Sequence, residues 1–531
     1  MFIQPNSNIK IYNDIPLDNK YEHTLYFPNI SSQNAYFHPT GKPKAKYVLT
    51  AQSYQRVVKS KMRIAKKAED LYDCNYLAFQ NASFGTKWFY AFITSVEYIN
   101  NETSEITFEI DKIQTYWLDL TLKEAFVERE HSSTDNIGDN IEPEPIEVGE
   151  YLFDDYTELT DNGGGSNISY KKTCVLIATS DTTGSVVDGT QYDGVYGGAK
   201  IRAFNSSDIT SINTYLATFV QAPDTVVSMY ICPTILVTYT SIPTGGVDLA
   251  STAISNGYTL YGKAITNSDK FGNYKPKNKK IYTYPFNYFQ VDNGNGQSLP
   301  IRYEFCKNLK PQFTLYGTIN QPVQLVLAPT NYKNVEGGEG LSSVLLTEKI
   351  TLESYPMSSW SIDTYSAWIA QNAVPMLIDI GRTGVNGVGS ILNGNIGGSI
   401  FGLSNLVGNI LTNQYKNSIA ADTIRGYTSS SNANVAHGLQ SFFCGRCRIT
   451  EQRAKVIDEY FTRFGYATNR IKVPNISARK IWNYVKTADC KLIGHAPADD
   501  ITFIEGLFNK GITFWKDSSK IGDYTGDNSI G

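Results

Sequence analysis

The longest uncharged stretch of the chain, residues 384–415, most constrains what the protein can fold into. Its apolar residues recur mostly at steps of three or four, which is the spacing of one helix face. They are Val385, Val388, Ile391, Leu392, Ile396, Ile400, Phe401, Leu403, Leu406, Val407, Ile410 and Leu411. Nine glycines between Gly381 and Gly408 oppose a helix, because each costs about 0.8–1 kcal/mol relative to alanine. The stretch is therefore a poor autonomous helix in water.

Small residues four apart give the same stretch a second property. Ser390, Gly394, Gly398 and Gly402 form the small-xxx-small pattern that lets apolar helices approach closely in lipid. As a helix, residues 385–411 would measure about 40 Å, enough to cross a bilayer core of about 30 Å. Six asparagines between positions 386 and 413 make the stretch too polar for an ordinary anchor. We predict a segment that is sheltered first and enters a membrane later, and a buried glycine-rich loop is the alternative.

The rest of the chain favours several β-rich domains. The length of 531 residues predicts more than one domain, and 36 Tyr, 25 Phe and 42 Gly are typical of β structure and turns. The net charge of −4 provides no field that would hold a polyanion, so a dedicated DNA-binding protein is disfavoured. The first residues lack the basic and apolar regions of a secretory signal, and we expect the chain to stay inside the cell that makes it.

The strongest local signal is a β-hairpin over residues 88–111. Residues 88–99 are apolar on both faces of an extended chain, which predicts a strand buried on both sides. After a turn at Asn100 and Asn101, apolar residues from Ile106 alternate with polar ones through Asp111. This alternation predicts a second strand with one apolar face and one face in water.

Composition shifts divide the chain into six expected parts. They are an N-terminal β domain (1–130), a connector with a Gly hinge (131–167), an inserted β-rich domain (168–267), a second β domain (268–369), a long hydrophobic loop (370–440) and a C-terminal α+β part (441–531). In the connector, Pro143 and Pro145 force an extended form that exposes Glu142 and Glu144 to water. Three consecutive glycines from Gly163 form the hinge.

Short polar and helical signals follow in the second half. The basic stretch 270–280 indicates a solvated loop, with contact to a phosphate or a partner as the alternative. Residues 450–464 predict an amphipathic helix that ends at Gly465. Asp499 or Asp500 is expected to cap a helix over 501–509, a strand over 512–515 follows, and residues 517–531 are expected to fray.

Signatures of catalysis and of metal binding are weak. The sequence has no GxSxG, HExxH, Walker or GxGxxG motif, so we predict no enzyme and no cofactor. Glu128 and Glu130 would share a strand face, which leaves glycoside hydrolysis as a remote alternative. His131 is expected to make a structural hydrogen bond. Cys444 and Cys447 form a lone CxxC without a second ligand pair, so we predict buried thiols and no metal.

Several blocks resemble one family in the same order along the chain. NYLAFQNASFGTKWFYAFITSVEY (75–98), FEIDKIQTYW (108–117) and FVEREH (126–131) are similar to tail-knob, or distal tail tube, proteins of small short-tailed phages of the Salas or picovirus group. The later blocks YPFNYFQVDNGNGQ (284–297), FGYATNRIKVPNISARKIWNYVKTADC (464–490) and NKGITFW (509–515) resemble the same family.

The resemblance implies a mainly β fold: tandem antiparallel β-barrel or sandwich domains that form a ring-shaped tube subunit, with short C-terminal helices. It implies a homo-oligomer, a hexamer, in the virion tail, assembled in the host cytoplasm beside lower tube or collar and tip proteins. Double-stranded DNA would pass through without sequence readout. The loop 370–440 would plug the tube and enter the host cell membrane on ejection.

Two other functions stay open at this point. A tail-tip cell-wall hydrolase would rest only on the carboxylate pairs. A receptor-binding tail protein would use the inserted domain, residues 168–267, as its contact surface.

Overall fold

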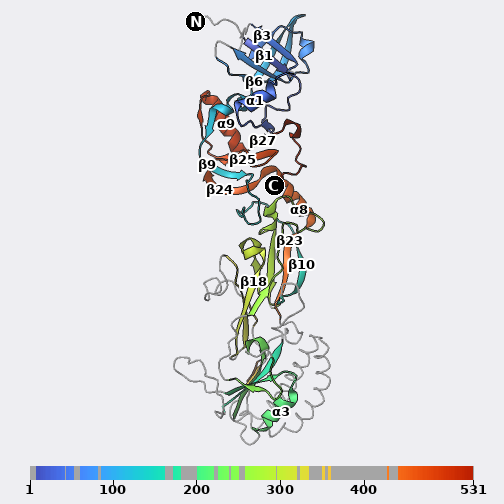
Figure 1. The fold of residues 1–531 in the computed structure, drawn as a ribbon, viewed down its shortest axis with the longest axis vertical. Coiled ribbons are helices and arrows are strands. Elements are labelled where there is room, and N and C mark those ends of the chain that lie inside the picture. The colour runs from blue at the N-terminus through green and yellow to red at the C-terminus, as the bar shows by residue number, and fades with distance from the viewer. Residues whose placement is uncertain are drawn as a thin grey trace. The chain divides into compact units, whose positions relative to one another are not determined.

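The computed structural model divides the chain into two compact units. It describes residues 7–41, 44–52, 60–81, 85–161, 172–180, 200–219, 225–237, 241–249, 258–294, 296–319, 323–333, 350–352, 357–359, 427–429 and 441–529. Unit 1 comprises residues 1–149, 270–281 and 450–531, and unit 2 comprises residues 150–269 and 282–449. The chain therefore passes from one unit to the other four times (Figure 1).

Unit 1 begins with a six-stranded antiparallel sheet. Its order is β3 (Tyr47–Gln52), β1 (Ser7–Tyr12), β5 (Tyr76–Asn81), β6 (Phe89–Asn100), β7 (Thr103–Ile110) and β4 (Lys61–Ile64). Ile9, Ile11, Leu77 and Ile106 form the core on one face. On the other face, Tyr12, Tyr76 and Tyr90 pack around Phe37 at the end of α1 (Ile30–Phe37).

The predicted hairpin is confirmed, and two details of its burial were wrong. β6 and β7 pair antiparallel from Ala91↔Ile110 to Asn100↔Thr103. β6 is buried only in its first half, because β5 pairs with it only from Phe89 to Phe92, and Tyr98 near the turn is 62% exposed. Asp111, predicted to face water, is buried because it caps α2 (Lys112–Tyr116) through the backbone N–H of Gln114.

The second sheet of unit 1 joins the N-terminal and C-terminal parts of the chain. Its order is β2 (Thr24–Leu25), β27 (Ile512–Trp515), β25 (Trp482–Ala488), β9 (Ala125–Glu130) and β24 (Tyr466–Lys472). A small sheet pairs β26 (Leu492–Gly494) with β8 (Leu120–Leu122). Trp482, Trp515 and Leu25 form a core on one face, and Ile504 and Phe508 of α9 (Ala498–Lys510) belong to the core on the other.

Both predicted C-terminal helices are present. α8 (Glu451–Phe464) starts at the cap Thr450 and ends at Gly465, which has φ 65°. A side chain at Gly465 would place Cβ 2.3 Å from the carbonyl oxygen of Glu130, so glycine is required there. α9 begins earlier than predicted, with Pro497 as its cap, and Asp499 and Asp500 lie inside its first turn, where carboxylates favour the helix dipole.

The expectation of frayed C-terminal residues is wrong for residues 517–529. The guanidinium of Arg479 donates a hydrogen bond of 2.6 Å to the carbonyl oxygen of Asn528. The ring of Tyr524 lies 5.5 Å from that of Trp482 and 5.3 Å from that of Trp515. The C-terminal residues therefore pack against Trp482 and Trp515. The polar composition of these residues did not indicate this packing.

Unit 2 contains two four-stranded antiparallel sheets that share a core. One has the order β10 (Tyr151–Glu158), β23 (Phe443–Ile449), β16 (Asn287–Asp292) and β17 (Ser298–Ile301). The other has the order β15 (Tyr258–Tyr261), β18 (Gln312–Thr318), β19 (Gln324–Pro329) and β20 (Ile350–Leu352). The rings of Phe289 and Phe313 lie 6.1 Å apart, and a Cβ on Gly262 would lie 2.7 Å from the Phe289 ring.

A six-stranded sheet completes unit 2. Its order is β14 (Val247–Asp248), β12 (Lys200–Asn205), β11 (Thr173–Thr179), β13 (Val226–Pro233), β21 (Met357–Ser359) and β22 (Tyr427–Ser429). Ile212 of α3 (Ile209–Ala217) packs in a cluster with Val175, Ile177 and Phe204. Two of these strands come from outside the predicted inserted range, and the six-part division of the chain stays a prediction.

The expected fold class is confirmed. The described chain is mainly β, its sheets are antiparallel except for the β2–β27 pair, and its helices are short.

Candidate functional site

The residues predicted to meet lipid lie outside the described part of the chain. They are the apolar residues from Val385 to Leu411 and the small residues Ser390, Gly394, Gly398 and Gly402. The hinge glycines also lie outside the described residues. Their roles therefore stay predictions. Within the described ranges, no helix is both long enough and apolar enough to cross a bilayer.

The structure does describe two short strands on either side of the uncharged stretch 384–415, and the second of them lies inside the range 370–440 predicted as a loop. β21 ends at Ser359 and β22 starts at Tyr427, and these two residues are paired in an antiparallel register. β21 also pairs with β13, where Ser228 is opposite Ser359 and Tyr230 is opposite Met357. The two ends of the segment between these strands are thus held next to each other on one sheet. MSS and YTS are too short and too polar to predict as strands, so sequence reasoning missed this feature.

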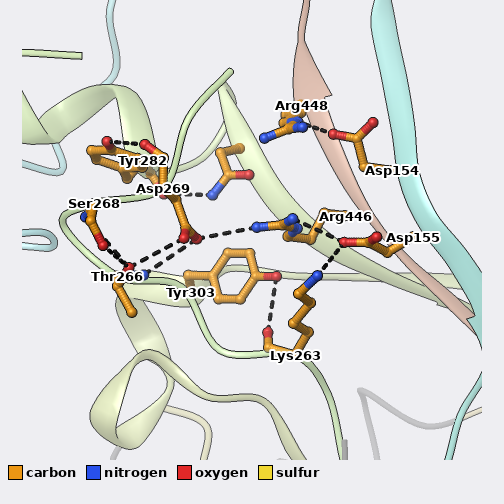
Figure 2. Close-up of polar contacts among 11 residues, drawn as sticks. Asp154, Asp155, Lys263, Thr266, Ser268, Asp269, Tyr282, Tyr303, Arg446 and Arg448 are labelled. Atoms are coloured by element: carbon orange, nitrogen blue, oxygen red, sulfur yellow. Dashed lines mark hydrogen bonds and ion pairs between the residues drawn. The ribbon is translucent and has the colours of Figure 1, made fainter. Parts of the chain in front are cut away.

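A cluster of paired charges lies where β10 and β23 meet the turn 263–269 (Figure 2). Arg446 contacts Asp155 at 2.9 Å and Asp269 at 3.1 Å, and Lys263 contacts Asp155 at 2.6 Å. Arg448 forms an ion pair with Asp154. Three cations face three carboxylates, so the charges of this cluster balance.

A bulge in β10 directs Asp155 into this cluster. Its φ is 55°, and the register of β10 against β23 shifts between Asp154 and Thr157. Hydrogen bonds, first from Lys263 and then from Arg446, hold the pKa of Asp155 below its ordinary value. The Asp155 carboxylate is paired with cations on neighbouring segments. The cluster is therefore better suited to holding these segments together than to acid–base chemistry. The pairing follows from strand register, which the sequence did not indicate.

The carboxylate pair considered for catalysis is separated by its surroundings. Glu128 pairs with Lys486 at 2.8 Å and its side chain is 44% exposed, whereas the side chain of Glu130 is 5% exposed and pairs with Lys472. The register between β9 and β25 skips Glu128, which is a bulge and breaks the alternation of the strand. The expectation that the two carboxylates share a strand face is therefore wrong, and each is paired with a lysine of a neighbouring strand.

The prediction that Glu144 is exposed to water is wrong. Its side chain is 1% exposed and accepts hydrogen bonds from Arg129, from Lys280 at 2.5 Å, and from the backbone N–H of Ala467 at 2.8 Å. Burial lowers the pKa of Lys280, and the nearby Glu144 opposes that shift. The proline-flanked connector is therefore fixed to unit 1 by a buried ion cluster.

The basic stretch 270–280 is not a solvated loop. Asp458 of α8 accepts hydrogen bonds from the Tyr274 hydroxyl at 2.6 Å and from the backbone N–H groups of Lys277 and Asn278, each at 2.9 Å. Lys280 is only 3% exposed. The run of lysines wrongly indicated a solvated loop, because the backbone of this stretch makes more of its contacts than the lysine ammonium groups do.

The predicted structural roles of His131 and of the cysteines are confirmed. His131 is fully buried; its Nδ1 accepts from the backbone N–H of Tyr484 at 2.8 Å, and its Nε2 lies 3.1 Å from the carbonyl oxygen of Thr462. Burial holds the pKa of His131 well below its ordinary value, so the ring is neutral. All seven cysteines are buried and free.

The CxxC motif lies within β23, which places its two thiols on opposite faces of a strand. Cys444 is opposite Val291, and Cys447 is opposite Tyr288 in an uninterrupted register. Burial raises the pKa of Cys444 to about 12. Among the described residues, no three His, Cys, Asp or Glu side chains gather as a metal centre requires.

Two family models match this chain. The model described as Bacillus phage phi29, tail knob protein gp9, C-terminal domain matches residues 252–529, which is more than half of the chain. The model of the caudoviral major tail protein N-terminus matches residues 5–121.

Curated relatives and one solved structure match nearly the whole length. Tail knob protein gp9 of Bacillus phage PZA is 25% identical over 601 aligned positions, covering 99% of this chain and 98% of the relative. The gp9 proteins of phages phi29 and B103 are 24% and 22% identical with the same coverage. The bacteriophage C1 tail knob protein, gp12, has a TM-score of 0.59 at 15% identity and 99% coverage of both chains, which shows a shared fold.

Proposed function

The chain belongs to the family of the tail knob protein gp9 of Bacillus phage phi29, and from this we infer that it is a structural protein of a phage tail knob. The resemblance seen in the sequence blocks is confirmed. The observation that carries the inference is the family match over residues 252–529 together with relatives aligned over 99% of the chain. The relatives are named as tail components, which agrees with the expectation of a non-enzymatic protein.

We propose that six copies form a ring at the far end of the tail, next to other tail proteins, and that double-stranded DNA passes through it. The net charge of −4 supports passage of DNA without tight binding, because a strongly basic lumen would bind the phosphates. The ring would form in the host cytoplasm and remain in the virion.

We further propose that the hydrophobic loops, residues 370–440, plug this ring and enter the host membrane on ejection, where they form a channel. The uncharged composition of 384–415 supports this, because such a stretch is costly to leave in water and favourable to place in lipid. Because β22 lies inside the range 370–440, its pairing with β21 supports a membrane-entering part, between Ser359 and Tyr427, whose two ends lie next to each other. Six such loops would give the small-residue faces around Gly394 and Gly398 helix partners.

A structure-guided deletion tests the membrane role. Because Ser359 and Tyr427 are register partners, residues 360–426 can be replaced by an Asn-Gly turn that joins β21 to β22 as a hairpin. We expect the full chain to release dye from liposomes of anionic phospholipid and the deleted chain to release none, while electron microscopy shows the same rings for both.

Point variants provide a matched control. Ile396→Lys introduces one charge into the predicted lipid-contacting part, residues 385–411, whereas Ile419→Lys introduces one charge outside it, within the same deleted stretch. We expect the first variant to lose dye release and the second to keep it, because a charge at the centre of a bilayer costs at least about 2.5 kcal/mol. Equal dye release from the full and the deleted chain would overturn the membrane role.

A further inference from the structure

The outer strand β10 carries an unusual number of exposed apolar side chains. Leu152 is 48% exposed, Phe153 52% and Tyr156 52%. In the four-stranded sheet, β10 pairs only with β23, and no other described strand pairs with it on its free side. Figure 1 shows β10 beside β23. An exposed edge with apolar side chains is a site for contact with another chain.

One face of this sheet is aromatic. The Tyr151 ring lies 5.7 Å from that of Tyr288, which lies 5.6 Å from that of Tyr284. Phe153 and Phe443 contact Tyr156, at 6.5 Å and 5.9 Å between ring centres. This row of rings leads from β10 across β23 and β16 toward β17.

The two arginines of β23 belong to the other face of the sheet. Arg446 and Arg448 alternate with Cys447 along β23, and both arginines are paired with aspartates. On the aromatic face, the Tyr156 hydroxyl donates a hydrogen bond of 2.7 Å to Asp292, and the Arg302 guanidinium lies 4.2 Å from the centre of the Tyr284 ring. This face therefore carries one cation at its edge, and not the row of cations that binds a phosphate backbone. Its uncharged rings with polar tips have the composition of a protein–protein interface.

Strand direction makes the opposite edge of the same sheet a suitable partner. Each neighbouring pair in the order β10, β23, β16, β17 is antiparallel, so β10 and β17 run in opposite directions. A second copy whose β17 lies along β10 continues the antiparallel order. Repeating this head-to-tail contact by rotation closes a ring.

The two edges are complementary in charge. Glu150 directly precedes β10, and Arg302 directly follows β17. The register Tyr151↔Ile449, Arg448↔Asn287 and Phe289↔Ile301 places both residues at the same end of the sheet. A head-to-tail contact would therefore bring a carboxylate of one copy toward a guanidinium of the next. Pro300 has no N–H group, so side-chain packing would contribute more than a continuous ladder of hydrogen bonds.

We propose that the β10 edge, defined by Glu150, Leu152, Phe153 and Tyr156, contacts the β17 edge of a second copy of this chain, defined by Leu299, Pro300 and Arg302. This inference rests on the proposed ring and assigns the surfaces that close it. The aromatic side chains that become buried in the contact stabilise it, and the Glu150–Arg302 pair determines how the two copies are oriented.

A charge swap in the full chain tests this contact, with particle mass measured by mass photometry at 50 mM salt. Glu150→Arg places two cations together at the joint and Arg302→Glu places two carboxylates together, so each should weaken assembly at least tenfold. The double variant Glu150→Arg, Arg302→Glu restores opposite charges and should return assembly to within about threefold of the native chain. Phe153→Asp should prevent ring formation. Tyr72→Asp, a 65% exposed aromatic in unit 1, should change nothing.

The outcomes separate this surface from the ring itself. Native rings that persist in both single charge variants, or a folded double variant that fails to reassemble, would overturn the assigned surface and leave the proposed ring intact. A stable two-copy particle indifferent to Arg302→Glu would indicate that β10 pairs with itself, which also contradicts the proposal. A native chain that stays monomeric at all concentrations would overturn the ring. Circular dichroism of each variant confirms folding.

Discussion

Glu144 lies between two prolines in an extended connector, a setting that predicts contact with water. Its carboxylate is nevertheless buried between Arg129 and Lys280. Asp458 is 1% exposed on the face of α8 that also buries Ile457 and Phe461. At the scale of single residues, Arg129 is 15 positions from Glu144, whereas Lys280 and the partners of Asp458 are more than one hundred positions away. The local sequence contains no signal for these distant partners.

Glu144→Gln should destabilise the chain by about 3–5 kcal/mol, because one partner of a buried ion cluster is removed and two buried cations lose their counter-charge. Urea unfolding followed by tryptophan fluorescence measures the loss. Glu128→Gln removes a half-exposed pair with Lys486 and should cost less than about 1 kcal/mol. Equal effects of the two substitutions would contradict the burial seen for Glu144.

Asp111 should make stability fall as the pH rises toward neutrality. Burial raises its pKa to about 7 from an ordinary value of 3.8, with Asp18 adding to the rise, while hydrogen bonds from the Gln114 backbone N–H and the Tyr76 hydroxyl oppose it. A raised carboxyl pKa stabilises the fold fully below about pH 4, and this contribution is lost as the pH passes through 7.

Asp111→Asn keeps an oxygen acceptor for the Gln114 N–H and cannot ionise. The difference in Tm between pH 5 and pH 8 should therefore shrink in this variant, and its Tm at pH 8 should exceed that of the native chain. Glu109→Gln, an exposed neighbour, is the control and should leave the pH profile unchanged. An unchanged profile in Asp111→Asn would show that Asp111 is already ionised at low pH.

Whole elements were predicted well where hydrophobic periodicity was long. Apolar spacing predicted the hairpin of β6 and β7, the helix α8 and the strand β27. Gly465 and Gly511 marked the ends of the two C-terminal helices. β21 and β22 could not be predicted, because three-residue strands with polar side chains carry no periodicity. They exist because β13 provides a neighbouring edge.

A cysteine pair at Ser358 and Thr428 tests the pairing of β21 with β22. These residues are directly opposite, at a spacing of about 4.5–5.5 Å between Cα atoms that a disulfide can span. We expect the double variant to form an internal disulfide under mild oxidation, visible as a shifted band on a non-reducing gel. The pair Met357→Cys, Tyr427→Cys is two residues out of register and should form far less.

At the scale of the whole chain, the expected division into consecutive parts meets a structure in which each unit is assembled from separate segments. Unit 1 takes residues from both ends of the chain and from 270–281. The sequence predicted only an insertion at residues 168–267, because composition reports on neighbours in sequence and not on strands that meet in one sheet.

Each unit has its own core, so substitutions in different units should act independently. Trp482→Ala in unit 1 and Phe289→Ala in unit 2 each remove a fully buried aromatic ring and should cost about 3–5 kcal/mol. We expect each to lower a different calorimetric transition, and the double variant to show both shifts added. A single transition that either substitution lowers equally would show that the units unfold together.

Composition, periodicity and ordered blocks of residues were sufficient to predict the β-rich class, the longest elements and the family, and the net charge of −4 follows from composition. The sequence by itself also determined the uncharged stretch on which the proposed membrane role rests. Tertiary structure alone decided which charges are buried, how the ends of that stretch are held together, and which strand edges are left without a partner. The physical reason is that burial, register and edge position depend on segments distant in the chain, whereas periodicity and composition are local.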